Sequence, residues 1–123
     1  MALSKAEEQL MDIIWENGKL FMKEIIECYP NPKPAATTIA TLLKRAQDKG
    51  FVSYTLYGNS RQYYPLVEKD DYFSKHVKNM VRDFFGDSPL QFASFFTQSG
   101  GLSDTELEDL KKIVEKEIKK REQ

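Results

Sequence analysis

Threonine and basic side chains recur along one face of a helix predicted between residues 35 and 49. At about 100° per residue, the α-helical step, one side carries Thr37, Thr38, Thr41, Lys44 and Arg45. Threonine is a mediocre helix former, so three threonines within two turns are not explained by helix propensity. Short hydroxyl-bearing side chains allow close approach to a DNA backbone or a thymine methyl group, and Lys and Arg bind phosphates and base acceptors. This face therefore predicts a DNA-recognition helix.

The opposite side of the same helix is apolar, with Ile39, Leu42, Leu43 and Ala46 predicted to pack in a core. A plainer interpretation is that the first threonines satisfy free N–H groups of the first turn, and that Lys44 and Arg45 are simply solvated. The segment that follows favours the DNA interpretation.

That segment, "FVSYTLYGNSRQYYPLV" (51–67), is rich in aromatic and β-branched residues and contains a predicted turn at 58–60. It predicts a β-hairpin whose tip presents Asn59, Ser60 and Arg61. These side chains suit contact with phosphates beside a groove. Three helices followed by a hairpin is the order of a winged helix-turn-helix.

Two helices are predicted before the recognition helix. Ser4 and Glu7 have the spacing of a capping box, and Asn17-Gly18 ends the first helix. The second is predicted from the apolar residues of "LFMKEIIECY" (20–29) and is ended by prolines. Trp15 is predicted to lie in the core between the first and third helices.

Residues 69–123 return to helical spacing, with helices predicted around 72–85, 90–96 and 103–120. Ser103 and Glu106 form a second capping-box pattern. The fold class predicted is mainly α with a small β-hairpin, divided into a winged-helix domain (1–68) and a helical domain (69–123).

The charge distribution agrees with this division. A net charge of −1 alone argues against nucleic-acid binding, but residues 30–66 hold five Lys or Arg against one acidic residue. One cysteine allows no intrachain disulfide, and neither a signal-peptide pattern nor a membrane-length apolar run is present, which predicts a cytoplasmic protein. The sequence has no Gly-rich phosphate loop, nucleophile elbow or H-E-x-x-H, so neither an enzyme nor a cofactor or metal site is predicted.

Three strings carry a family resemblance: "LSKAEEQLMDIIWENGKLFMKEI", "TTIATLLKRAQDKGFV" and "RQYYP". They resemble the penicillinase-repressor family, which includes repressors of β-lactamase and methicillin-resistance genes. The resemblance implies a homodimeric winged-helix transcriptional repressor of the antibiotic response that binds a palindromic operator in double-stranded DNA. Thr38, Thr41 and Arg45 match the family's recognition helix, and Arg61 matches its basic wing residue. Ala40 and Ala35 depart from it, where relatives often carry a polar residue and a capping serine.

The resemblance also implies that residues 69–123 form the dimerisation module. The apolar positions assigned to it are Phe73, Val77, Met80, Phe84, Leu107, Leu110, Ile113, Val114 and Ile118. In the β-lactamase branch, a membrane sensor containing a zinc protease triggers cleavage within this module. The segment that aligns with the cut contains Ser94, Phe95 and Phe96.

Two alternatives remain open from the sequence. A winged-helix protein-interaction module without DNA binding is suggested by the near-neutral charge and by four tyrosines predicted to be exposed, Tyr54, Tyr57, Tyr63 and Tyr64. A repressor released by a small ligand in the C-terminal module is the other alternative.

Overall fold

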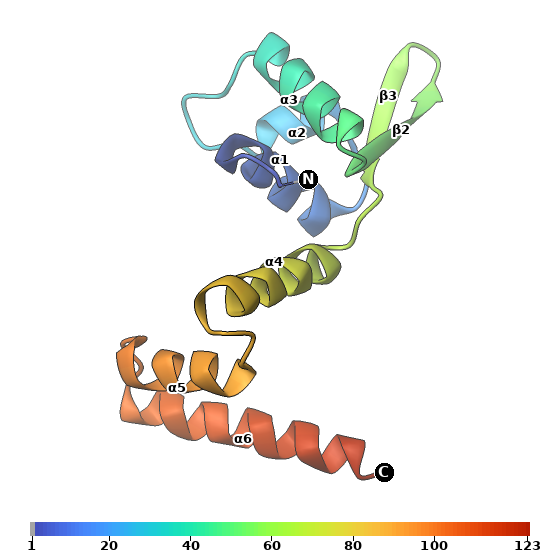
Figure 1. The fold of residues 1–123 in the computed structure, drawn as a ribbon. Helices are drawn as coiled ribbons and strands as arrows, with labels where there is room; N and C mark the ends of the chain where they lie inside the picture. Colours follow the sequence, from blue (N-terminus) through green and yellow to red (C-terminus); the bar gives the residue numbers. More distant parts are fainter. Residues whose placement is uncertain (1) are drawn as a thin grey trace. The chain divides into compact units, whose positions relative to one another are not determined.

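A computed structural model describes residues 2–123. The elements are α1 (Lys5–Asn17), β1 (Leu20–Phe21), α2 (Met22–Glu27), α3 (Ala36–Asp48), β2 (Val52–Tyr57), β3 (Ser60–Pro65), α4 (Lys69–Phe84), α5 (Pro89–Ser99) and α6 (Asp104–Arg121) (Figure 1). The fold is mainly helical with one small antiparallel sheet, as predicted. The chain divides into two compact units, residues 1–74 and 75–123. The division into functional domains at residues 68 and 69 stays a prediction.

The first helix begins as its sequence predicts. The Ser4 hydroxyl accepts a hydrogen bond from the Glu7 N–H (3.2 Å), and the Glu7 carboxylate accepts one from the Ser4 N–H (2.7 Å). These two bonds satisfy backbone donors that the first turn leaves free.

The predicted second helix starts too early, which is a correction. Leu20 and Phe21 are extended and form β1, which pairs with β3, and α2 begins only at Met22. The extended backbone buries the Leu20 side chain and adds a third strand in the order β1-β3-β2. A two-residue strand has no periodicity of its own, so an apolar residue such as Leu20 fits the helical spacing of the residues that follow it.

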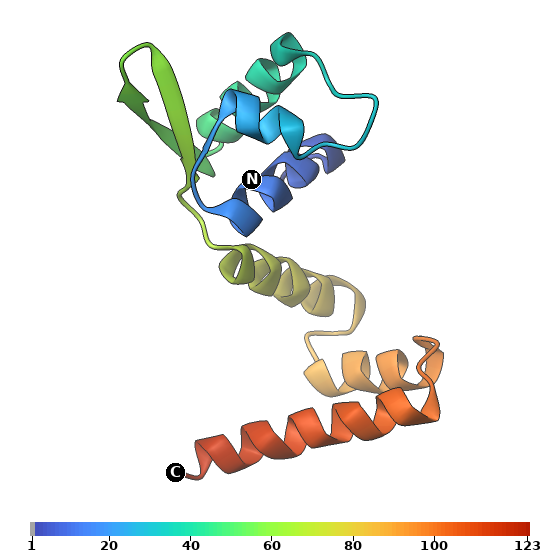
Figure 2. The ribbon, with the colours of Figure 1, turned by 180° about the vertical axis from the view of Figure 1, so that it is seen from behind.

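The hairpin forms with a shorter turn than predicted. Tyr57 pairs with Ser60, so Ser60 is the first residue of β3 and only Gly58 and Asn59 lie in the turn. Gly58 has a φ of +62°, a value that glycine adopts at little steric cost. Figure 2 shows the hairpin projecting beyond the helices of residues 1–74.

The core of residues 1–74 is formed by α1, α2, α3 and one face of the sheet. The four residues of α3 predicted to face inward, Ile39, Leu42, Leu43 and Ala46, are all buried. Trp15 is partly buried against this core, as predicted, but its ring contacts are with α4 and not with α3. Its ring packs on Tyr72 (5.8 Å between centroids) and Phe73 (6.2 Å), so it lies between α1 and the first turns of α4. Its Nε1–H donates to the Val67 carbonyl (2.8 Å).

Residues 75–123, all of which the structure describes, have little core of their own. Val81 is the apolar residue buried among them. Aromatic rings of Phe85 and Phe92 meet edge to face (5.5 Å), and Phe92 stacks on Phe96 (6.1 Å). The α6 helix starts with the predicted capping box, in which Ser103 and Glu106 exchange hydrogen bonds of 3.0 and 3.1 Å.

Candidate nucleic-acid interface

The polar face of α3 is open to solvent along its length. The predicted contact residues Thr37, Thr38, Thr41, Lys44 and Arg45 are all exposed. The Thr41 hydroxyl donates to the Thr37 carbonyl one turn earlier (3.0 Å), which leaves its oxygen free to accept and its methyl group free to pack. Burial of the other face orients this one outward.

The two basic residues of α3 differ in their surroundings. Lys44 pairs with Asp48 one turn away (3.0 Å), but both side chains are well exposed. Such a pair contributes little to stability, so a phosphate can replace Asp48 as the partner of Lys44. The Arg45 guanidinium has no hydrogen bond or ion pair with any residue of the described chain 2–123. It is free to form bidentate contacts with a base or a phosphate.

Ala35 occupies the N-cap of α3 and makes no side-chain hydrogen bond there. The departure from a capping serine noted in the sequence therefore leaves first-turn N–H groups without a side-chain acceptor. Replacing a capping side chain by alanine costs about 1 kcal/mol.

Arg61 lies on the side of the hairpin that faces α3. Its guanidinium carbon is 4.4 Å from the centre of the Tyr54 ring, a cation–π geometry. A side-chain hydrogen bond with Tyr63 raises the pKa of Arg61 above its ordinary value, so the group stays charged. The prediction that the four hairpin tyrosines are exposed is wrong for three of them: Tyr63 is buried, Tyr54 and Tyr64 are half-buried, and Tyr57 is exposed.

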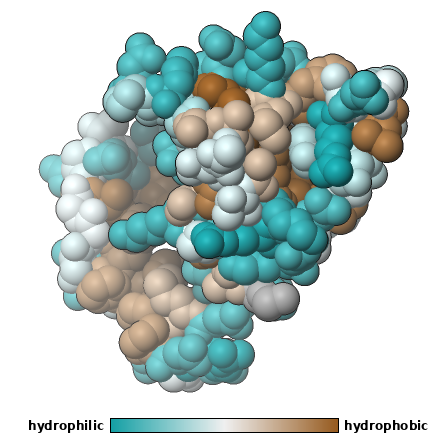
Figure 3. Space-filling view, turned by 90° about the horizontal axis from the view of Figure 1, so that it is seen from above, coloured by the Kyte–Doolittle hydropathy of each residue, from teal (hydrophilic) through white to brown (hydrophobic). Residues whose placement is uncertain are grey.

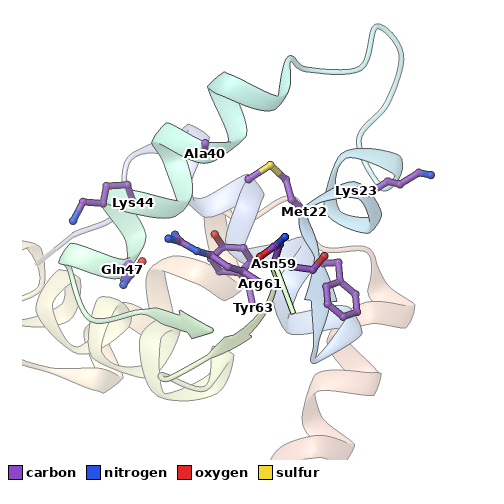
Figure 4. Close-up of a pocket in the computed structure, with 10 residues that line it drawn as sticks. Met22, Lys23, Ala40, Lys44, Gln47, Asn59, Arg61 and Tyr63 are labelled. Atoms are coloured by element: carbon purple, nitrogen blue, oxygen red, sulfur yellow. The ribbon is translucent and has the colours of Figure 1, made fainter. Parts of the chain in front are cut away.

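A groove of about 430 Å³ separates α3 from the hairpin (Figure 4). One wall consists of Ala40, Lys44 and Gln47 of α3, and the facing wall of the turn and β3, with Asn59, Ser60, Arg61 and Tyr63. Of the five predicted helix residues, Lys44 lines this groove and faces the predicted wing residues Asn59, Ser60 and Arg61 across it. Thr37, Thr38, Thr41 and Arg45 lie outside its lining.

Phe21, Met22 and Lys23, from β1 and the start of α2, complete the lining, and the Lys23 side chain extends away from the groove (Figure 4). These residues were expected in the second helix and were not among the predicted contact residues. The available signal was the "KLFMKEI" part of the family-like string, which was interpreted only as a helix. In the view from above, hydrophilic atoms surround a smaller apolar group on the near surface (Figure 3).

The C-terminal end of α3 is joined to α1 by a partly buried ion pair that was not predicted from the sequence. The Lys49 ammonium lies 2.6 Å from the Glu7 carboxylate and donates to the Ala2 carbonyl (3.0 Å). Burial favours the protonated form of Glu7, but hydrogen bonds from Lys49 and Ser4 outweigh it and lower its pKa. This pair helps to hold α3, and hence its exposed face, against α1.

No group of three or more His, Cys, Asp or Glu side chains that could hold a metal ion occurs among residues 2–123. Within the same range, no helix is long and apolar enough to cross a membrane.

A family model described as penicillinase repressor matches residues 3–116. The chain belongs to the penicillinase repressor family. Among similar proteins is the methicillin resistance regulatory protein MecI of Staphylococcus aureus strain N315, 32% identical over 115 residues, covering 93% of this chain and 94% of that protein. The penicillinase repressor of Staphylococcus aureus is 26% identical over 113 residues, covering 91% of this chain and 90% of that protein.

A solved structure, the solution structure of the DNA-binding domain of the repressor BlaI, has a similar fold. It is 30% identical, with a TM-score of 0.51, and the match covers 57% of this chain and 87% of that one. The resemblance to the penicillinase-repressor family is confirmed by these matches.

Proposed function

We propose that this chain is a transcriptional repressor that binds DNA in a sequence-specific manner through α3 and the β2–β3 hairpin. The observation that carries the proposal is the two-sided α3, whose inward residues are all buried and whose five predicted contact residues are all exposed. In this arrangement α3 enters the major groove, and the hairpin reaches the adjoining backbone. Thr38, Thr41 and Arg45 are assigned to base contacts, and Lys44, Asn59, Ser60 and Arg61 to phosphates. Thr37, at the first turn, is assigned to the DNA backbone.

We propose that the repressor acts as a homodimer on a palindromic operator. The support comes from residues 75–123, which leave Val77, Phe84, Ile113, Val114 and Ile118 exposed on 43–79% of their surface. Apolar residues spaced along helices in this way favour association with a second copy. Met80, Leu107 and Leu110 are half-buried within the same segment. Phe73, assigned to dimerisation as well, packs on Trp15 in residues 1–74 and is 40% exposed.

We further propose that a membrane sensor protease system relieves repression by cleavage near Ser94, Phe95 and Phe96. These residues lie in the middle of α5. Phe95 packs on Phe85 (5.5 Å between centroids), and the Ser94 carbonyl accepts a hydrogen bond from Thr97 (3.1 Å). Cleavage of a helical segment requires that the helix open locally, so helix opening is part of the proposed mechanism.

Fluorescence anisotropy with labelled DNA tests the DNA-binding proposal. The probes are the DNA upstream of the chain's own gene, which contains an inverted repeat if the proposal is right, and a random duplex of equal length. Arg45→Ala is expected to weaken binding to the repeat by about 1–3 kcal/mol and to weaken random binding less. Lys112→Ala, on exposed α6, is the control and is expected to bind as the wild type does. Equal losses on both DNAs would remove the base-reading role of Arg45.

A different function, protein interaction without DNA binding, is favoured by one observation: the hairpin exposes Leu56 and Tyr57 on 60% and 56% of their surface. Absence of any anisotropy change at low salt, on either DNA, would support it. Release by a small ligand would instead use a cavity among residues 75–123, such as the one of about 260 Å³ lined by Val77, Val81 and Phe92.

A further inference from the structure

The α5 helix has few interactions that keep it folded. None of its residues is buried, and it contains no charged residue that could form an ion pair along the helix. Six of its eleven residues are Phe, Ser or Thr, which form helices less readily than Ala, Leu or Gln. An isolated helix of this length is marginal in water. The hydrogen bonds at its two ends therefore contribute a large share of its stability.

The C-terminal end of α5 closes on Phe96. The Gly100 N–H donates to the Phe96 carbonyl (2.9 Å), and the Phe96 ring stacks on Phe92 one turn earlier (6.1 Å between centroids). A Cβ atom at Gly100 would overlap the Phe96 carbonyl oxygen and would lie 3.1 and 3.3 Å from two carbon atoms of the Phe96 ring. The next residue, Gly101, has a φ of +73°. Gly100 is thus required for space and Gly101 for its backbone conformation.

We propose that the close contact between Gly100 and Phe96 controls how often the cleavage segment (residues 94–96) opens, and so sets the rate at which a protease can cut it. The inference rests on the proposed relief of repression by cleavage. It deepens that proposal, because it assigns the regulation of the cut to the repressor itself. Phe96 belongs to the cleavage segment, and its carbonyl is the acceptor of the bond that closes the helix.

The C-terminal end is the shorter route to an open cleavage segment. Unwinding from that end reaches the segment after residues 97–99, whereas unwinding from the other end must first release residues 89–93. The Ser88 hydroxyl also holds the other end, by accepting a hydrogen bond from the Gln91 N–H (3.2 Å). While the C-terminal end is closed, the Thr97 hydroxyl donates to the Ser94 carbonyl (3.1 Å). Loss of the Gly100 bond therefore frees the residues that protect the segment.

Hydrogen–deuterium exchange of the full chain tests the role of Gly100. The methyl group of Gly100→Ala overlaps the Phe96 carbonyl, so the end of α5 must shift or open. Backbone strain of this kind makes opening about 5–100-fold more frequent, and the exchange rate of the α5 amides is expected to rise by the same factor. The amides of α6 serve as the internal reference and are expected to exchange as in the wild type.

Gly101→Asn is the matched control. No atom lies within 4 Å of a Cβ at Gly101, and asparagine tolerates the left-handed backbone there. Its exchange is therefore expected to stay within about twofold of the wild type.

Limited digestion with chymotrypsin, which cuts after aromatic residues, gives a second measurement on the same variants. Cutting after Phe95 and Phe96, located by mass spectrometry, is expected to accelerate in Gly100→Ala by the same factor as exchange, because the protease acts on the opened helix. The Gly101→Asn control is expected to be cut at the wild-type rate.

Exchange and cutting of Gly100→Ala at wild-type rates would overturn the inference and leave the proposed function standing. Faster exchange in α6 as well as in α5 would also overturn it, because the variant would then have lost structure throughout residues 75–123. Neither measurement uses the sensor protease. A chain that a sensor system never cuts would therefore refute the proposed relief by cleavage, while the role of Gly100 in opening α5 would be decided by exchange alone.

Discussion

Replacement of Lys49 by Met would break the ion pair that joins α3 to α1. The methylene part of the side chain is kept, while the ammonium that lies 2.6 Å from the Glu7 carboxylate is lost. Glu7 has a side-chain exposure of 2%, so water cannot replace the ammonium at that carboxylate without disturbing the core. The variant therefore leaves a buried charge whose remaining hydrogen bond comes from the Ser4 N–H.

The expected loss of stability in Lys49→Met follows from how deeply the two side chains of the pair are buried. Removing one partner of a fully buried ion pair costs about 3–5 kcal/mol. The Lys49 side chain is 25% exposed, so partial hydration lowers the expected loss to about 2–3 kcal/mol. For a unit of this size each kcal/mol changes the melting temperature by about 4–8 °C, so Lys49→Met is expected to melt roughly 10–20 °C lower.

Urea unfolding followed by Trp15 fluorescence measures this loss. Trp15 is the one tryptophan of the chain and lies in residues 1–74, so its signal reports the unit that contains the pair. Lys69→Met is the control, because its pair with Asp12 is long (3.7 Å) and both side chains are about half exposed. The control is expected to lose less than about 1 kcal/mol.

The stabilisation by the Glu7–Lys49 pair depends on pH in a predictable direction. Because the folded state lowers the pKa of Glu7, the pair stabilises the protein fully above the unfolded value of about 4.3. That contribution is lost as the pH falls through the lower, folded pKa. The difference in the free energy of unfolding between wild type and Lys49→Met should therefore become smaller as the pH is lowered below about 4. A loss below about 0.5 kcal/mol at pH 7, or a gap that does not change with pH, would refute the role of the pair.

Three further predictions concern other parts of the chain. Ala35→Ser supplies a capping hydroxyl to α3 and is expected to raise the free energy of unfolding by about 1 kcal/mol in urea; no gain would mean that water already satisfies those N–H groups. Trp15→Phe removes the 2.8 Å bond to the Val67 carbonyl and is expected to lower stability by about 1 kcal/mol, followed by circular dichroism. Ile113→Glu places a charge on the exposed apolar stripe of α6 and is expected to weaken the proposed dimer by at least about tenfold in light scattering, whereas a dimer of unchanged affinity would place the interface elsewhere.

The features predicted correctly are those that depend on residues close together in the sequence. The capping boxes at Ser4 and Ser103 and the inward face of α3 all depend on residues within a few positions of one another. Helical spacing and hydroxyl–carboxylate spacing are therefore sufficient to find them.

Features that depend on distant partners were not predicted. The pairing of Leu20 with Tyr63 spans more than 40 residues, and the bond from Trp15 reaches Val67, 52 positions away. The Glu7–Lys49 pair joins residues 42 apart, although both lie in the family-like strings. Single-sequence periodicity contains no information about which distant elements meet.

Only part of the candidate site was predicted, because the rest depends on elements that are distant in the sequence. The exposed α3 face follows from helical spacing, but the groove depends on how α2 and the hairpin pack beside α3. One part of it could have been found: alternation along β3 places Arg61 on the same face as Tyr63, which is buried. That spacing indicates an arginine directed along the groove, toward α3.

The small buried core of residues 75–123 has a consequence for regulation. If this segment acquires its core by pairing with a second copy, its folding depends on protein concentration. Where most copies are single, the amount of paired protein rises with the square of the total. Halving the intact copies would then lower the paired form about fourfold. Loss of a minority of copies would thus be amplified into a larger loss of occupied DNA, without any cooperativity between DNA sites.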